Sequence, residues 1–112
     1  MMIEKIVYDY LSDALSAPVC LEIPPKPPAE FVRIEKTGGH TSNRIHYATI
    51  AIQSYGSSLY QASALNEDVK AAMDTITTLQ DVSSCELNAN YNYTDTTEKR
   101  YRYQAVFDVV FL

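Results

Sequence analysis

The chain has 112 residues, of which 46% are hydrophobic and 21% are charged, and its formal net charge is −5. This length predicts a single domain over residues 1–112 that can fold without metal or disulfide staples. The hydrophobic content argues against intrinsic disorder, and the acidic balance weighs against a nucleic-acid-binding surface, which normally needs a basic stripe.

The first predicted element is an amphipathic helix near the N-terminus. Its apolar residues recur at spacings of three and four, and Pro18 predicts where it has ended. A short strand over 19–23 follows, and the proline-rich segment 24–28 predicts a stiff connector at or outside the sheet edge. The residues of the helical stripe are Ile3, Ile6, Val7, Tyr10, Leu11, Ala14 and Leu15.

Two strands are predicted next, over 30–36 and 44–55. Both faces of the second strand are largely apolar, which predicts a central strand covered on both sides. The segment 37–43 between them contains Gly38 and Gly39 and is predicted to be a mobile hairpin tip, with positive φ angles at the glycines and no bound anion or metal. A second helix is predicted over 59–77.

The end of the chain predicts a second hairpin. Its first strand, 85–93, alternates cleanly, with Cys85, Leu87, Ala89, Tyr91 and Tyr93 on one face and Glu86 and three asparagines on the other. Residues 94–99 form the turn, and the return strand spans 100–112. The predicted fold class is α+β in the order α-β-β-β-α-β-β, a mostly antiparallel sheet with two helices packed on one face. The predicted core is Ile6, Val7, Leu11, Leu15, Ile50, Ile52, Leu65, Val69, Met73, Leu87, Phe107 and Val109.

Cys20 and Cys85 lie far apart and lack a Cys-x-x-Cys spacing. Buried free thiols are the favoured interpretation, with a disulfide or a metal site as the alternative. The charged N-terminus is unlike a signal peptide, and no apolar run approaches the ~20 residues that span a membrane, so a soluble protein made in a cytoplasm is expected. The basic cluster 99–102 is flanked by acidic residues and predicts a solvated turn.

No pattern in the chain predicts an enzyme. A phosphate-binding loop needs a lysine after its glycines and a helix behind it, whereas here Lys36 precedes Gly38 and Gly39 and a strand follows. His40 and His46 lack a third ligand at a suitable spacing. Since no Gly-x-Ser-x-Gly or Cys–His signature occurs and the carboxylates are scattered, we expect no catalytic residues, no metal and no cofactor.

Tyrosine is the compositional anomaly, with nine among 112 residues. Aromatic side chains with a polar tip suit interfaces, because they bury a large area at modest entropic cost. Ordinary strand propensity explains them equally well, so both interpretations stay open. Those in predicted strands are Tyr47, Tyr91, Tyr93, Tyr101 and Tyr103.

Two segments, "PPKPPAEFVRIEKTGG" and "ATIAIQSYGSSLYQASALNEDVKAAM", carry a family resemblance. The chain resembles the small tail-terminator or tail-completion proteins of long-tailed bacteriophages and prophages in the order of its elements along essentially its whole length. The most specific match is the strand ending at Glu35 to Gly39, which follows the family's Glu-[Arg/Lys]-Thr-Gly-Gly pattern. The chain departs from that pattern at Asn43-Arg44, where the family often carries an acidic residue.

The resemblance implies a ring, commonly of six subunits, that caps the tail tube and joins it to the head connector or neck. Its partners would be other copies of the chain, the tube protein and the connector, with no catalytic residues, no cofactor and no membrane. Such a protein assembles in the host cytoplasm and then belongs to the virion tail, and an acidic lumen would let DNA pass without specific binding. The interface hypothesis names Lys36, Thr37, Gly38, Gly39, His40, Tyr91, Tyr93, Tyr101 and Tyr103.

Two alternatives remain. Within the same class, the chain could be a neck, head–tail joining or minor capsid protein. From another class, it could be a small-ligand-binding or enzymatic α+β domain in which Tyr91, Tyr101 and Tyr103 line a pocket.

Overall fold

A computed structural model describes residues 2–112 and contains two helices and one five-stranded sheet. The strand order is β1-β2-β3-β5-β4, and all neighbours are antiparallel except β1 and β2. The predicted α+β fold and its element order are therefore confirmed. The elements are α1 (Ile3–Ala14), β1 (Val19–Cys20), β2 (Phe31–Ser42), β3 (Ile45–Gly56), α2 (Leu59–Met73), a 3-10 turn η1 (Ile76–Thr78), β4 (Val82–Asn92) and β5 (Tyr101–Phe111).

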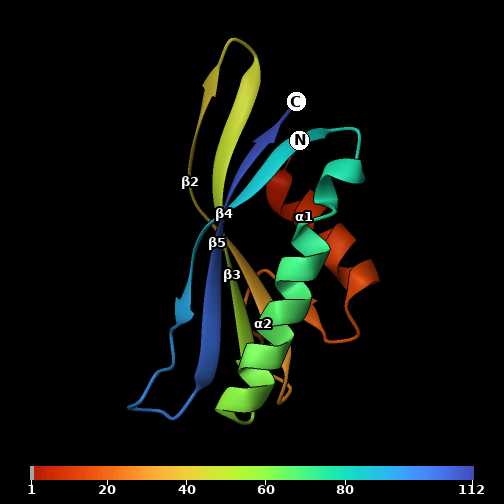
Figure 1. Ribbon diagram of the computed structural model, residues 1–112. Coiled ribbons are helices and arrows are strands. Elements are labelled where there is room, and N and C mark those ends of the chain that lie inside the picture. Colours follow the sequence, from red (N-terminus) through yellow and green to blue (C-terminus); the bar gives the residue numbers. More distant parts are fainter. Residues whose placement is uncertain (1) are drawn as a thin grey trace.

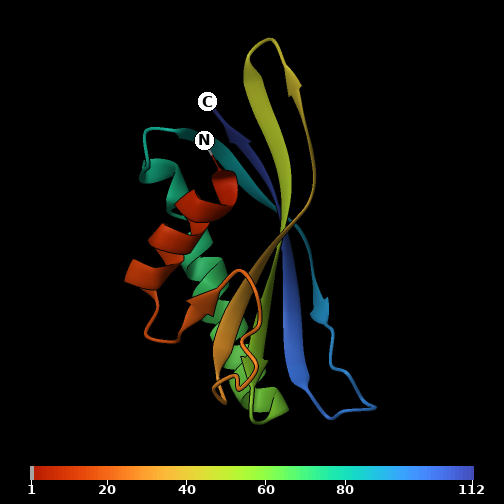
Figure 2. The ribbon, with the colours of Figure 1, turned by 180° about the vertical axis from the view of Figure 1, so that it is seen from behind.

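Both helices lie on the same face of the twisted sheet, and the opposite face carries no helix (Figures 1 and 2). Each helix buries one apolar stripe against the sheet, as its spacing of three and four dictates. Ser58 caps the N-terminus of α2, and its hydroxyl oxygen accepts a hydrogen bond from the backbone N–H of Gln61 at 3.1 Å. The core between the layers includes Ile3, Val7, Leu11, Val32, Ile34, Ile50, Ile52, Leu65, Val69, Met73, Phe107 and Val109.

Three residues of the predicted core lie elsewhere. Ile6 and Leu15 are half-buried and pack against the core from the rim of α1. Leu87 is 47% exposed, because it lies on β4 at the edge of the sheet, where α2 does not reach far enough to cover it. The prediction of a buried Leu87 is wrong.

The first predicted strand is shorter than expected. β1 contains only Val19 and Cys20, which pair in parallel with Val32 and Arg33 of β2, and the prolines then take the chain away from the sheet. Because β1 is so short, the outer edge of β2 has no strand beside it from Ile34 onward.

The predicted loop 37–43 is wrong. β2 continues through it to Ser42, with a bulge between Lys36 and Gly38, and the turn consists of Asn43 and Arg44 alone. Those two residues have φ angles of 51° and 66°, as a two-residue hairpin turn requires, whereas neither glycine has a positive φ. The hairpin therefore projects as regular paired strands beyond the helical layer (Figure 1, yellow).

The predicted alternation of strand 85–93 is also wrong. A bulge between Leu87 and Ala89 adds one residue to β4 and reverses the facing of all later residues. Leu87 is thus on the helical face, while Tyr91 is on the open face. Asn90, predicted to face away from Leu87, turns toward α2 and exchanges hydrogen bonds with the buried Asn66, both at 3.1 Å.

The end of α2 and the covering of β3 differ from the sequence prediction. α2 ends at Met73 rather than at residue 77, and η1 then carries Ile76 back into the core. β3 is central, as predicted, but no second layer covers its open face. Ala51, Gln53 and Tyr55 are nevertheless at most 4% exposed, because long side chains of the neighbouring strands close over them.

Candidate functional site

The open face of the sheet carries a row of polar side chains contributed by four strands. Gln53 on β3 donates from Nε2 to Oε1 of Gln104 on β5 at 2.8 Å, and Gln104 donates in turn to the Tyr91 hydroxyl on β4. Arg33 on β2 approaches Gln53 Oε1 at 3.5 Å. The Gln53 and Gln104 amides are buried and have partners within the chain, so they offer no free group to a ligand. The Nε of Arg33 is buried and has no hydrogen-bond partner among the described residues.

Arg102 on β5 contacts both Tyr55 and Tyr93, which lie next to this row on the open face. Its guanidinium lies 4.4 Å from the Tyr93 ring centroid and donates to the Tyr55 hydroxyl at 3.1 Å, while its Nε donates to the Tyr93 carbonyl at 2.6 Å. Cation–π contact of this kind stabilises by about 0.5–1 kcal/mol at exposed sites. Of the predicted solvated turn 99–102, Lys99 and Arg100 are exposed, whereas Arg102 is structural.

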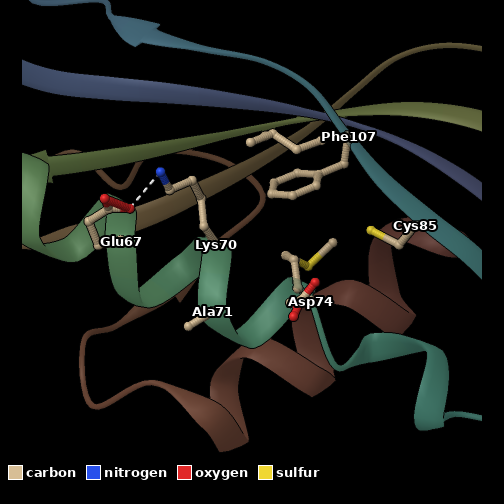
Figure 3. A pocket seen from close by; sticks show the side chains of 8 residues that line it. Glu67, Lys70, Ala71, Asp74, Cys85 and Phe107 are labelled. Carbon is tan, nitrogen blue, oxygen red and sulfur yellow. Dashed lines mark ion pairs between the residues drawn. The ribbon is translucent and has the colours of Figure 1, made fainter.

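A groove of about 390 Å³ lies on the helical face between α2 and the β4 edge (Figure 3). Its floor is apolar, formed by Met73, Leu87 and Phe107 together with the Cys85 side chain. Glu67 and Lys70 of α2 and Asp74, which directly follows the helix, form the polar rim, where Lys70 pairs with Glu67 at 2.6 Å. Among residues 2–112, Asp74 has no ion-pair partner.

Cys85 is a poor nucleophile in this setting. Burial, followed by the nearby carboxylates of Asp74, Asp108 and Glu86, raises the pKa of the Cys85 thiol to about 11. Cys20 is likewise a free, half-buried thiol, and burial raises its pKa. Reactive cysteines have lowered pKa values, so neither thiol is suited to nucleophilic catalysis.

The projecting hairpin is stiffened by cross-strand side-chain pairs. The rings of His40 and Tyr47 stack with centroids 4.6 Å apart, and Thr41 Oγ1 and His46 Nδ1 form a hydrogen bond at 2.9 Å. Both histidines of the chain take part in these contacts, and neither contact involves a carboxylate or a thiol. In the part of the chain that the structure describes, no three His, Cys, Asp or Glu residues are grouped as metal ligands would be.

The residues of the interface hypothesis form two separate groups. Lys36 to His40 lie on the projecting hairpin, and all five are exposed. Tyr91, Tyr93, Tyr101 and Tyr103 lie toward the opposite end of the sheet, near the β4–β5 turn (Figure 1).

The four tyrosines do not line a common cavity. Tyr91 shares the open face with Gln104, and Tyr103 alternates to the helical face. Tyr101 lines a small cavity with Phe31 and Tyr55 at the end of the sheet. The sequence did not predict the α2–β4 groove, because it placed Leu87 in the core, whereas the structure leaves Leu87 exposed on the groove floor.

A scan against family profiles gave no match, and a search of curated proteins gave no significant relative. None of the helices within residues 2–112 combines the length and apolar character needed to cross a bilayer.

Proposed function

We propose that the chain is a structural protein of a phage or prophage tail. Its copies form a ring, commonly of six, at the head-proximal end of the tail tube, where the ring ends tube growth and joins the tube to the head connector. The proteins assemble in the host cytoplasm and remain in the virion tail. The acidic ring lets DNA pass without specific binding.

The observation that carries this proposal is the place of the Glu35–Gly39 motif, the most specific part of the family resemblance. Residues 36–44 are all exposed, and the hairpin tip reaches past the helices. Its β3 strand pairs with β5, whereas the outer edge of its β2 strand has no neighbouring strand. A regular, stiffened hairpin that contributes nothing to the core is suited to contact another subunit.

The polar rows on the open face also support an assembly protein over a ligand-binding one. Tyr91 and Tyr103 point to opposite faces of the sheet, whereas a tyrosine-lined pocket would need them on one face. The buried Gln53 and Gln104 side chains form hydrogen bonds with each other and with neighbouring side chains.

The test is a paired shortening of the hairpin in the phage that encodes the chain. Deletion of Thr41–Ser42 and Ile45–His46 leaves the Asn43-Arg44 turn between His40 and Tyr47, which are partners in the native register, and spares the core residue Ala48. Removing an even number of residues from each strand keeps the same type of hydrogen-bonded pair next to the turn. Circular dichroism and denaturant unfolding of the purified variant verify that the fold persists.

We expect tails of abnormal length that lack heads. Tails of normal length without heads would instead identify a neck or head–tail joining protein. Normal tails with heads attached would refute a role of the hairpin in tail completion.

A further inference from the structure

We infer that copies of this chain associate head to tail by pairing the outer edge of β2 with the outer edge of β4. The inference deepens the proposed function by naming the ring interface, and it rests on that function only for the closure of the ring. A sheet edge is a row of unpaired N–H and C=O groups and therefore a template for another strand. Here both outer edges of one sheet are open, at β2 from Ile34 onward and along β4.

The outer edges of β2 and β4 match in their level along the strand axis and in the relative direction of their strands. Following the register across the sheet, Gly38 is level with Glu86, Gly39 with Cys85 and His40 with Ser84. β2 and β4 run in opposite directions, because three antiparallel steps separate them. A neighbouring copy rotated about an axis along the strands would therefore place its β2 antiparallel to β4, in the pairing that hairpins use.

The regular parts of the two edges also coincide. The bulges of β4 fall between Val82 and Ser84 and between Leu87 and Ala89, which leaves Ser84–Leu87 as an uninterrupted stretch. On β2 the stretch after the bulge begins at Gly38. If the two edges pair, their hydrogen bonds would therefore form between the parts of β2 and β4 that contain no bulge.

Gly38 borders the bulge of β2, but its conformation there does not require a glycine. Its φ is not positive, and a Cβ built on it meets nothing within 4 Å. Glycine inside a strand destabilises it by roughly 0.5–1 kcal/mol relative to alanine. Interior strand glycines often mark a place where another backbone approaches closely, and a neighbouring β4 edge supplies that approach.

Charge complementarity points to the same partner. Residues 36–48 contain Lys36 and Arg44 and no acidic residue, whereas the groove beside the β4 edge carries Glu67 and Asp74 against Lys70 alone. Lys36 is level with Leu87, so a neighbour's Lys36 would lay its stem on the exposed Leu87 and direct its ammonium toward Asp74. Within residues 2–112, neither Lys36 nor Asp74 has an ion-pair partner, and a carboxylate at the C-terminal end of α2 is unfavourable to the helix dipole.

Disulfide trapping tests this interface. In a background of Cys20→Ala and Cys85→Ala, one variant carries Gly38→Cys and a second, size-tagged variant carries Glu86→Cys. Within one subunit these positions are three strand spacings apart, about 14 Å. This exceeds the ~7 Å limit for Cα atoms of a disulfide, so every cross-link must be intermolecular.

Mild oxidation of the mixed variants at high concentration should give the mixed dimer in several-fold excess over either homodimer. The double variant should give a ladder beyond dimer. Lys36→Glu in the first variant should reduce the mixed dimer several-fold, and Asp74→Lys in the second should restore it. A matched control places the second cysteine at Asp13, on the exposed side of α1.

Equal amounts of homodimers and mixed dimer, or a yield no higher than the Asp13 control, would overturn the inference. If the disulfide forms but the hairpin deletion leaves tails normal, the interface between copies stands and the tail function is refuted. If the hairpin deletion disrupts tails but no disulfide forms, the tail function stands and the pairing between copies is refuted. A strand of the tube protein would then be the partner of the open edge.

Discussion

The inner and outer halves of the β2–β3 hairpin have similar strand geometry but are stabilised by different means. Under the helices, Ala48, Ile50 and Ile52 are at most 2% exposed and belong to the core. Beyond the helices, the strands are held by the His40–Tyr47 stack and the Thr41–His46 hydrogen bond. Cross-strand pairs of this kind contribute roughly 0.2–1 kcal/mol each, less than burial of one large core side chain. The inner half therefore stabilises the fold, and the outer half is free to serve contacts with other molecules.

The largest expected effect separates the core from the outer hairpin. Leu11→Ala should lower the free energy of unfolding by ~2–4 kcal/mol, because Leu11 is 0% exposed and its loss leaves a cavity. Tyr47→Ala, which removes the stacking partner of His40, should cost about 1 kcal/mol or less. Urea unfolding followed by circular dichroism measures both. Equal losses would contradict the division between the two halves.

An intermediate effect distinguishes the two adjacent glycines. A Cβ on Gly39 would lie 2.7 Å from the Tyr47 carbonyl oxygen, so Gly39→Ala should destabilise by about 1–2 kcal/mol through overpacking. Gly38→Ala has open space and should be neutral or stabilise by up to about 1 kcal/mol.

The glycine comparison is made by thermal unfolding at low protein concentration, where association does not contribute. If Gly38→Ala destabilises as much as Gly39→Ala, Gly38 is required by its own chain and its use in the interface inference is wrong.

The effect that is smallest at neutral pH, where it is absent, concerns Cys85 under the helical layer. The folded-state pKa of about 11 lies above the ordinary value of 9.0, so the folded chain holds this proton more tightly than the unfolded chain. The resulting stability is fully present below about pH 9 and is lost as the pH rises toward 11.

Cys85→Ala should therefore show a shallower fall in the free energy of unfolding across this range, measured by urea titration at each pH. Cys20→Ala is the matched comparison, since Cys20 lies at the opposite edge of the sheet from Cys85. Burial raises the pKa of Cys20 as well, so this variant should flatten the profile in the same direction but less than Cys85→Ala. Parallel pH profiles for the native chain and both variants would exclude a folded-state shift at Cys85.

Local patterns in the sequence determined the elements and their order. The apolar spacing of α1 and α2, the prolines after β1 and the alternation of β5 each express a period that a helix or strand imposes on its own residues. The α+β fold followed because two apolar stripes need one sheet face to cover.

Only the tertiary structure decided the bulges, the edges and the groove. The bulge in β4 reverses which residues face α2, and nothing in a period-two pattern marks where one residue is added. Gly38 and Gly39 indicated a turn from the sequence, yet Asn43 and Arg44 make it, because the register with β3 set the length of β2. The open edges of β2 and β4 were likewise invisible in the sequence, since strand pairing depends on contacts between residues far apart in the chain.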